Sequence, residues 1–214
     1  MFTLFRIGEW PNYYDGVQFP KGKAVLEEFY RQGTPNTAPA DFDIAAEAGA
    51  ALFDKIGEGI LVTHSQGGTV GWRTAIRNGN VKAIVAYEPG GSPFLFPEGE
   101  MPAPVQTSYG TIAAKSIPLD DFKKLTKIPI VIYYGDNIAS KPTPNFGRDQ
   151  WRAELAMARA FAATINKYGG NATVVHLPEI GITGNTHFIF SDLNNIKIAD
   201  LLSDWLKKNN LDGR

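Results

Sequence analysis

A serine between a short apolar run and a pair of glycines is the residue in this sequence best placed to act as a nucleophile. Ser65 follows the run Ile60–Val62 and precedes Gly67 and Gly68. The apolar run predicts a strand buried on both faces, and the helix formers from there to Arg77 predict a helix. At such a junction the hydroxyl is exposed at the carboxyl edge of the sheet, where the helix N-terminus favours developing negative charge. The stretch therefore predicts a nucleophile elbow.

Two features keep other interpretations of this stretch open. Thr63 occupies the position two residues before the serine, where the elbow pattern has glycine, so a branched side chain must fit under the turn. Ser65 could also serve only as a helix cap, as serines often do. Phosphate binding is disfavoured because the stretch lacks both G-x-x-x-x-G-K-[ST] and G-x-G-x-x-G.

Polar residues follow the other predicted strands at equivalent positions. Glu88 follows the second predicted strand, Asp136 follows the third, and His187 ends the loop after the fourth. In open parallel sheets, ligands bind outside the carboxyl ends of the strands, where these positions would meet. A serine hydroxyl needs an imidazole to take its proton and a carboxylate to orient that imidazole. The sequence contains all three residue types in the order serine, acid, histidine.

The elements that must position these residues alternate between strand and helix. The predicted strands are Ile60–Val62, Val81–Tyr87, Ile128–Gly135 and Ala172–Leu177. The predicted helices are Ala24–Gln32, Asp41–Ile56, Gln66–Arg77, Leu119–Lys127, Arg148–Tyr168 and Asn195–Lys208. This order predicts an α/β domain over residues 1–214, with a mostly parallel sheet and flanking helices. Among the first forty residues only Phe2–Ile7 has the pattern of a strand.

A long connection, residues 92–127, interrupts this alternation. Its first part is rich in Pro, Phe and Gly and is far longer than the usual link between a strand and a helix. We expect it to be a lid or cap insertion. Phe94, Phe96 and Met101 are predicted to line an apolar substrate pocket beneath it. The alternative, a disordered excursion, is disfavoured because these side chains could be buried against the body.

Composition excludes several classes of function. The chain has 214 residues, 43% of them hydrophobic, and a formal net charge of −1, so a single globular domain without a nucleic-acid-binding face is expected. It has no apolar run long enough to span a membrane and no secretory signal, which predicts a soluble chain, cytoplasmic if Met1 is the true start. The absence of cysteine excludes disulfides and thiolate metal sites. No metal or organic cofactor is expected.

The motifs resemble those of the α/β-hydrolase superfamily, whose triads run serine, acid, histidine. The resemblance covers about Asp41 to Leu206. Three strings resemble more narrowly a bacterial carboxylesterase branch that takes its acid, a glutamate, one strand early: Thr63-His-Ser-Gln-Gly-Gly, Ala86-Tyr-Glu-Pro-Gly-Gly and Gly184-Asn-Thr-His, the last with Asp192-Leu-Asn-Asn after it. This resemblance implies that Glu88 is the acid.

The choice between Glu88 and Asp136 can also be argued from position. The usual acid lies about three residues after the glycine that ends the third strand. Counted from Gly135, that position is occupied here by Ile138. Asp136 comes two residues early and could simply close the Gly135 turn. Glu88 ends a buried strand, where an unpaired carboxylate would be costly, so we expect it to have a partner, namely the imidazole.

The three histidines have different expected roles. His187 lies in a Gly/Asn/Thr-rich loop long enough to hang over the sheet edge, which favours it as the base. His176 lies within a predicted strand and is expected to be structural. His64 directly precedes the nucleophile, and adjacent strand side chains point apart, so it is predicted to be a wall of the substrate pocket.

The front of the fold is not evident in the sequence. The N–H of Gln66 is the expected oxyanion donor, but no early strand and loop offer a second donor. We therefore expect either a truncated protein or a hydrolase completed by another chain, with low activity by itself and an exposed edge at Ile60–Val62 that favours a homo-oligomer.

Two functions follow. The first is a serine hydrolase that cleaves small-molecule carboxylic esters through an acyl-enzyme on Ser65. The alternative is a catalytically silent hydrolase-fold module that serves in binding or assembly.

Overall fold

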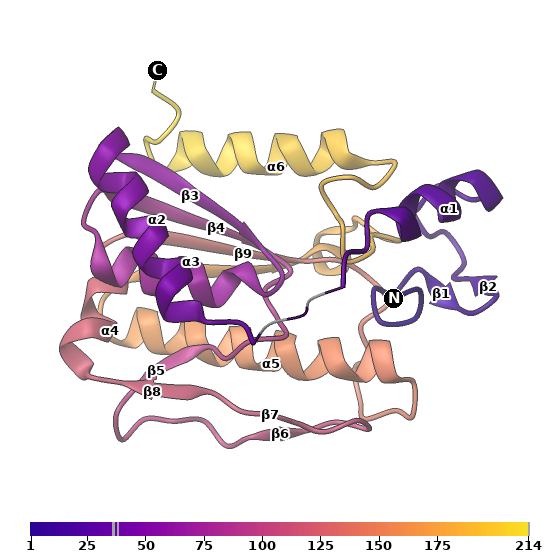
Figure 1. Cartoon of the computed structure of the whole chain (residues 1–214), viewed down its shortest axis with the longest axis horizontal. Helices are drawn as coiled ribbons and strands as arrows, with labels where there is room; N and C mark the ends of the chain where they lie inside the picture. Colours follow the sequence, from indigo (N-terminus) through magenta and orange to yellow (C-terminus); the bar gives the residue numbers. More distant parts are fainter. Residues whose placement is uncertain (36, 38, 214) are drawn as a thin grey trace.

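A four-stranded parallel sheet forms the centre of the molecule (Figure 1). The computed structural model describes residues 1–35, 37 and 39–213. The strands lie in the order β10 (Asn171–His176), β9 (Pro129–Tyr134), β4 (Val81–Tyr87) and β3 (Gly59–His64). All three pairings are parallel. The carboxyl ends of the strands therefore share one edge of the sheet, as predicted.

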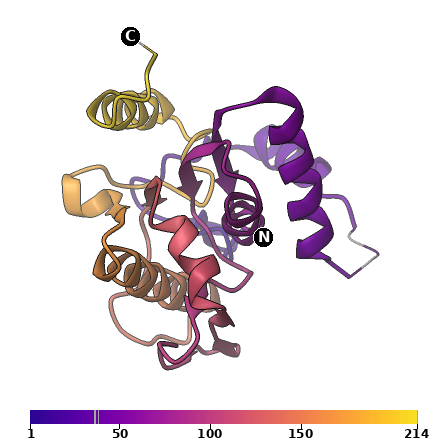
Figure 2. The ribbon, with the colours of Figure 1, turned by 90° about the vertical axis from the view of Figure 1, so that its left-hand side faces the viewer.

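Helices cover both faces of this sheet. Figure 1 shows α3 (Gly67–Arg77) and α5 (Phe146–Lys167) on one face and α6 (Asn195–Lys208) on the other, and Figure 2 shows the same layers turned by 90°. Successive side chains of β4 enter different cores because strand side chains alternate. Ile84 packs with α3 and α5, whereas Val85 packs with α6. The observed α/β architecture confirms the predicted fold class.

Most predicted elements end within about two residues of their observed bounds, which is the usual uncertainty of helix and strand ends. The early helices are α1 (Lys23–Arg31) and α2 (Phe42–Ile56). Asp41 caps α2 by accepting hydrogen bonds from two backbone amides of its first turn. Asp43 ties α2 to α3 through ion pairs of 2.7 Å with Arg73 and 2.5 Å with Arg77.

β3 is an edge strand of the sheet within the described residues. Val62, two residues after Ile60 and therefore on the same α6-side face of the strand, is 54% exposed. The predicted exposed edge is therefore present in this structure.

The strand predicted over Phe2–Ile7 is wrong. Residues 2–6 form successive turns, in which the amide of Phe5 donates to the carbonyl of Met1 and the amide of Ile7 donates to that of Phe2. The apolar residues pack inward into a small N-terminal core with Phe29 instead of alternating along a strand. Two-residue strands β1 (Gly8–Glu9) and β2 (Asn12–Tyr13) follow as a hairpin.

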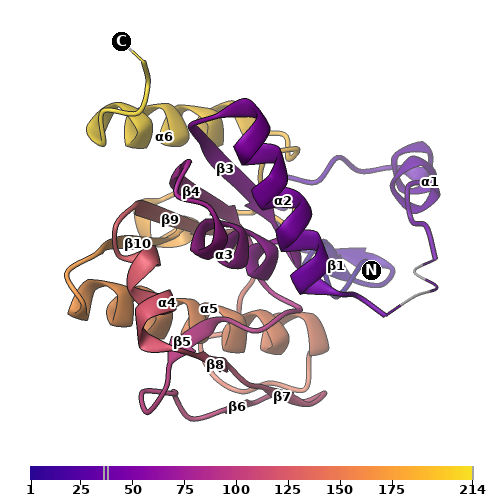
Figure 3. The same ribbon diagram turned by 60° about the vertical axis from the view of Figure 1, so that its left-hand side comes forward.

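The N-terminal part lies at the carboxyl end of the sheet strands. Figure 1 shows α1, β1 and β2 beyond the arrowheads of β3, β4 and β9. In Figure 3, α1 stands well apart from α2, although the two helices are consecutive in the chain. This arrangement brings the first turns of the chain to the edge where the predicted site residues meet.

The insertion over 92–127 packs along the α5 side of the molecule (Figure 1). Its strand β5 (Leu95–Pro97) pairs in parallel with β8 (Lys115–Ile117), and β6 (Val105–Gln106) forms a hairpin with β7 (Thr111–Ile112) before α4 (Leu119–Leu125). Ser108 in the hairpin donates its amide to Asp149 at the start of α5, at 2.6 Å. A lid role for this segment stays a prediction.

The three residues predicted to line a pocket beneath this insertion lie in two different places. Phe94 and Phe96 are 2% and 1% exposed and pack on Phe161 of α5. Aromatic side chains bury a large apolar area, which favours their place in the core. Met101 follows Glu100, whose carboxylate binds the side chains of Lys167 and Tyr168. That end of α5 leads into the start of β10, so Met101 lies at the end of the sheet opposite Ser65.

Candidate active site

Ser65 occupies a strained turn between β3 and α3. Its φ is +55°, a left-handed conformation that non-glycine residues rarely adopt. The turn is held by the Ser65 amide, which donates to the Tyr87 carbonyl at 3.0 Å, and by the Gly68 amide, which donates to the Ser65 carbonyl at 3.0 Å. The N-cap position of α3 belongs to Gln66, and no side chain caps it. The predicted elbow geometry is therefore present, and a capping role for Ser65 is not.

Thr63 fits under this turn because a glycine in the helix makes room for it. A Cβ added at Gly71 would lie 2.7 Å from Cγ2 of Thr63, which is closer than real Cβ atoms approach. A Cβ at Gly67 would lie 3.9 Å from the Cβ of Thr63, which is ordinary contact. The branched residue in the elbow is thus accommodated by Gly71, one helical turn into α3.

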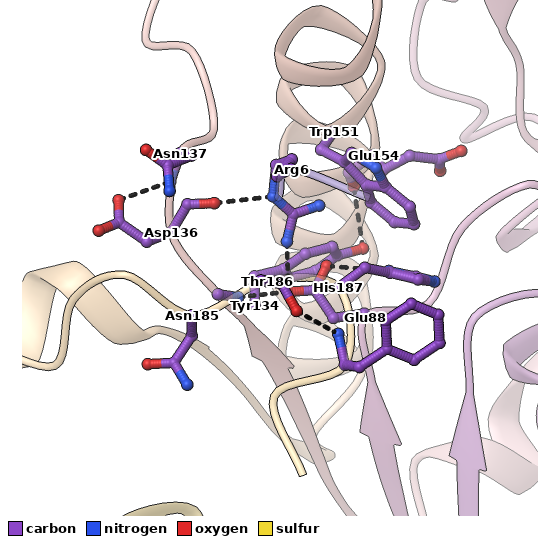
Figure 4. A network of polar contacts seen from close by, with 12 residues as sticks. Arg6, Glu88, Tyr134, Asp136, Asn137, Trp151, Glu154, Asn185, Thr186 and His187 are labelled. Carbon is purple, nitrogen blue, oxygen red and sulfur yellow. Dashed lines mark hydrogen bonds and ion pairs between the residues drawn. The ribbon is translucent and has the colours of Figure 1, made fainter. Parts of the chain in front are cut away.

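Glu88 is fully buried at the end of β4 and carries a charge there. Its Oε1 accepts hydrogen bonds from Nη2 of Arg6 at 2.7 Å and from the amide of Gly135 (Figure 4). Burial by itself would raise the pKa of Glu88, but the charge of Arg6 and the hydrogen bond with His187 hold it at about 2. Its φ of +50° is also left-handed. Strained residues that cluster in this way motivate a functional hypothesis.

His187 lies against the other oxygen of Glu88. Its Nδ1 is 3.5 Å from Oε2 of Glu88, and because an ionised carboxylate only accepts hydrogen bonds, the proton belongs on Nδ1. The imidazole is 1% exposed and is packed between Phe5, at a ring-centroid distance of 4.8 Å, and Trp151, at 4.3 Å. Burial lowers the pKa of His187 to about 4, against the opposing effect of Glu88. Within the described residues, Nε2 has no hydrogen-bond partner.

Ser65 lies at the same carboxyl edge of the sheet as Glu88 and His187. The residue before it, His64, has its ring centroid 4.5 Å from that of His187, and its Nε2 donates to the His187 carbonyl at 2.9 Å. The residue that accepts the Ser65 amide, Tyr87, directly precedes Glu88. His64 is therefore a neighbour of the pair, and burial lowers its pKa.

Asp136 closes the turn after Gly135, which was the alternative to its being the acid. Its Oδ1 accepts from the amide of Asn137 at 2.6 Å, and its Oδ2 accepts from the amide of Gly184 at 2.7 Å. The carboxylate thus anchors the loop that carries His187, and within the described residues it forms no hydrogen bond to the imidazole. Asp192 anchors the same loop by accepting from the amide and hydroxyl of Thr186.

His176 lies at the opposite edge of the sheet from Ser65. It ends β10, whereas Ser65 follows β3, and three strand spacings put about 14 Å between them. Its Nδ1 is 3.3 Å from Oε1 of Glu179 on the surface. The structure therefore keeps His176 away from the other site residues.

Comparisons with known proteins agree with this architecture. No family model matches the chain. The chain is 27% identical over 231 residues to a probable secreted lipase, phiG, from a fungus, Fungal sp. (strain ATCC 74256), in a match that covers 97% of this chain and 64% of the relative. A solved structure described as a novel bacterial esterase matches with a TM-score of 0.74 and 29% identity, over 97% of this chain and 56% of that one. These similarities and the shared fold support the α/β-hydrolase superfamily.

The chain spans about 64% and 56% of the lengths of those two relatives. No helix within the described ranges has the length and apolar character needed to cross a bilayer. The fungal relative is named as a secreted protein, so a cytoplasmic location finds no support in it.

Arg6 is a residue of the candidate site that the sequence did not predict. It is fully buried, its Nη2 binds Glu88, and its Nε donates to the carbonyl of Asp136 at 2.7 Å. Its guanidinium carbon also lies 4.9 Å from the centre of the Trp151 ring (Figure 4). The partner expected for Glu88 was the imidazole, yet the closer partner is this arginine. A charged residue within an apolar run was the available signal, since such a residue needs a buried counter-charge.

Proposed function

We propose that this chain is a serine hydrolase that cleaves carboxylic esters through an acyl-enzyme on Ser65. The observation that carries the proposal is the state of His187 beside the elbow. Its Nδ1 faces the buried carboxylate of Glu88, while its Nε2 is left without a partner among the described residues. An imidazole held in this tautomer can accept a proton on Nε2. The names of the two relatives, a lipase and an esterase, support an ester as the substrate.

Acylation would proceed in two proton transfers through His187. Oγ of Ser65 attacks the acyl carbon while Nε2 of His187 takes the hydroxyl proton. The N–H of Gln66, at the start of α3, stabilises the oxyanion together with the helix dipole. The tetrahedral intermediate then collapses, the bond to the alcohol oxygen breaks, and His187 gives its proton to that oxygen.

Deacylation repeats these steps with water as the nucleophile. His187 takes a proton from water, the hydroxide attacks the acyl carbon, and Ser65 leaves with the proton returned. Glu88 orients the imidazole and stabilises its charged form, and Arg6 keeps Glu88 ionised. Arg6 is thus a positioning residue, since it acts through Glu88.

Three variants test this proposal in a hydrolysis assay with a short-chain aryl ester. Ser65→Ala and His187→Ala should each lower kcat by several orders of magnitude, because each removes one partner of the nucleophile–base pair. His176→Ala should keep most of the activity, since it lies at the far edge of the sheet. If His176→Ala were as inactive as His187→Ala, the assignment of the base would be wrong.

The alternative, a catalytically silent module, is not favoured by the similarity to a lipase and an esterase. The same assay decides it. Turnover by the unsubstituted protein that equals that of Ser65→Ala would support the silent module.

A further inference from the structure

An apolar hollow lies beside the loop that carries His187. It has a volume of about 520 Å³ and is lined mainly by side chains of α1, of the segment before it, and of the residues just after His187. Its floor contains Phe19 and Phe29, which are 8% and 6% exposed. Phe188 and Phe190 form the side nearest the site, and Phe190 is 43% exposed. A volume of this size is typical of small-molecule pockets.

Ring contacts connect the hollow to the candidate active site. Phe190 lies edge-on to His64, with ring centroids 4.9 Å apart, and Phe188 lies edge-on to His187 at 5.2 Å. Phe188 also contacts Phe29 on the floor at 5.7 Å. A molecule seated in the hollow would therefore lie one aromatic ring away from the two histidines.

The position of the hollow relative to His187 indicates which part of an ester it would take. In the proposed reaction, Nε2 of His187 must deliver its proton to the oxygen of the departing alcohol. The alcohol group must therefore lie on the histidine side of Ser65. Phe188 and Phe190 extend the histidine loop on that side, and among the described residues Glu28 is the one charged residue that lines the hollow. Glu28 is directed to an ion pair with Arg31.

We propose that this hollow binds the apolar alcohol group of the ester substrate, so that the enzyme selects esters of long-chain or aromatic alcohols. The assignment rests on the proposed ester hydrolysis and adds the substrate class. It replaces the pocket expected from Phe94, Phe96 and Met101, which lie elsewhere.

Two ester series test which side of the substrate the hollow recognises. One series consists of acetates of methanol, butanol and octanol, and the other of methyl esters of acetic, butyric and octanoic acids. The value of kcat/KM should rise along the alcohol series, by up to about fourfold for each methylene that becomes fully buried. It should change much less along the acyl series. A rise confined to the acyl series would overturn the assignment.

Variants in the hollow make the test specific. Phe190→Ala removes the exposed wall, and Val25→Phe fills the space from α1, so each should lower the ratio of kcat/KM for octyl over methyl acetate by about tenfold. Leu52→Ala is the control, because it removes an exposed apolar side chain from α2 and should leave the ratio unchanged. An unchanged ratio in both hollow variants would overturn the proposal while ester hydrolysis stands.

Binding of 1-octanol to the Ser65→Ala variant separates this proposal from the proposed function. Titration calorimetry should detect binding that Phe190→Ala, added to Ser65→Ala, weakens by about tenfold. If octanol binds in this way but the unsubstituted protein hydrolyses no ester, the hollow is supported and the proposed function is overturned. Equal affinity of the two variants for octanol would overturn the assignment of the hollow.

Discussion

Glu88 is the residue on which the charge balance of the candidate site depends. It has no exposed surface, yet Arg6, Gly135 and His187 supply partners for both of its oxygens. Removing one partner of such a pair leaves a buried charge without compensation, which typically costs about 3–5 kcal/mol. The same residue orients the imidazole. Its substitution should therefore change the stability through the buried charge and the activity through the imidazole.

The first prediction at this scale concerns the identity of the acid. Glu88→Gln should lower kcat by about 10³–10⁴-fold, because the amide no longer holds the imidazole in the required tautomer. Asp136→Asn should lower it by less than about tenfold, because that carboxylate anchors Asn137 and Gly184 and does not bind the imidazole. Steady-state kinetics measure both, with thermal melts to confirm that each variant is folded. A reversed order would assign the acid to Asp136.

The second prediction concerns pH. His187 must be neutral to accept a proton, and burial lowers its pKa from 6.5 to about 4. Activity should therefore be retained as pH falls through 6.5 and should decline only as pH falls through about 4. Glu88, with a pKa of about 2, stays ionised over this range. A profile of kcat/KM against pH tests this, and an acidic limb centred near 6.5 would contradict the burial of His187 in the substrate-free protein.

The sequence predicted Ser65, Glu88 and His187 as site residues because each follows a recognisable strand or lies in a recognisable loop. It did not predict Arg6, whose position depends on a left-handed turn that no repeating pattern encodes. It also misplaced Phe94 and Phe96, since apolar side chains in a long loop fit a pocket or a core equally well.

At the scale of elements, the elbow is the contact between β3 and α3 that positions Ser65. Gly71→Ala places a methyl group 2.7 Å from Cγ2 of Thr63, whose β-branched side chain cannot easily turn away. We expect a loss of about 1–3 kcal/mol in the free energy of unfolding, partly offset by the better helix propensity of alanine. Denaturant titration measures it.

Two companion variants make this prediction specific. Adding Thr63→Ser removes Cγ2 and should recover most of the lost stability, which appears as a coupling energy in a double-mutant cycle. Gly79→Ala, where a new Cβ meets nothing within 4 Å, should change stability little. Independent effects of Gly71→Ala and Thr63→Ser would contradict the packing account.

The regular elements could be predicted because their hydrophobic periodicity is strong. β4 and α6 have the predicted bounds. The N-terminal turns and the short strands of the insertion could not, because two- and three-residue strands are too short to show alternation and owe their conformation to tertiary contacts.

At the scale of the whole molecule, the outer edge of β3, which no strand of the described residues pairs with, has consequences beyond the site. Unpaired edge strands favour pairing with another chain, and Val62 adds exposed apolar surface there. We expect the protein to self-associate in solution and Val62→Lys to weaken that association by at least about tenfold. Sedimentation velocity over a concentration series measures it. A wild-type protein that stays monomeric at high concentration would contradict this prediction.

The central claim is that Ser65 is the nucleophile, and covalent labelling tests it most directly. A fluorophosphonate, which reacts with activated serines, should form an adduct that peptide mass spectrometry locates on Ser65. The adduct should be absent in Ser65→Ala and form far more slowly in His187→Ala, whereas His176→Ala should label at nearly the unsubstituted rate. An adduct on a different residue, or active ester hydrolysis without any adduct on Ser65, would contradict the claim.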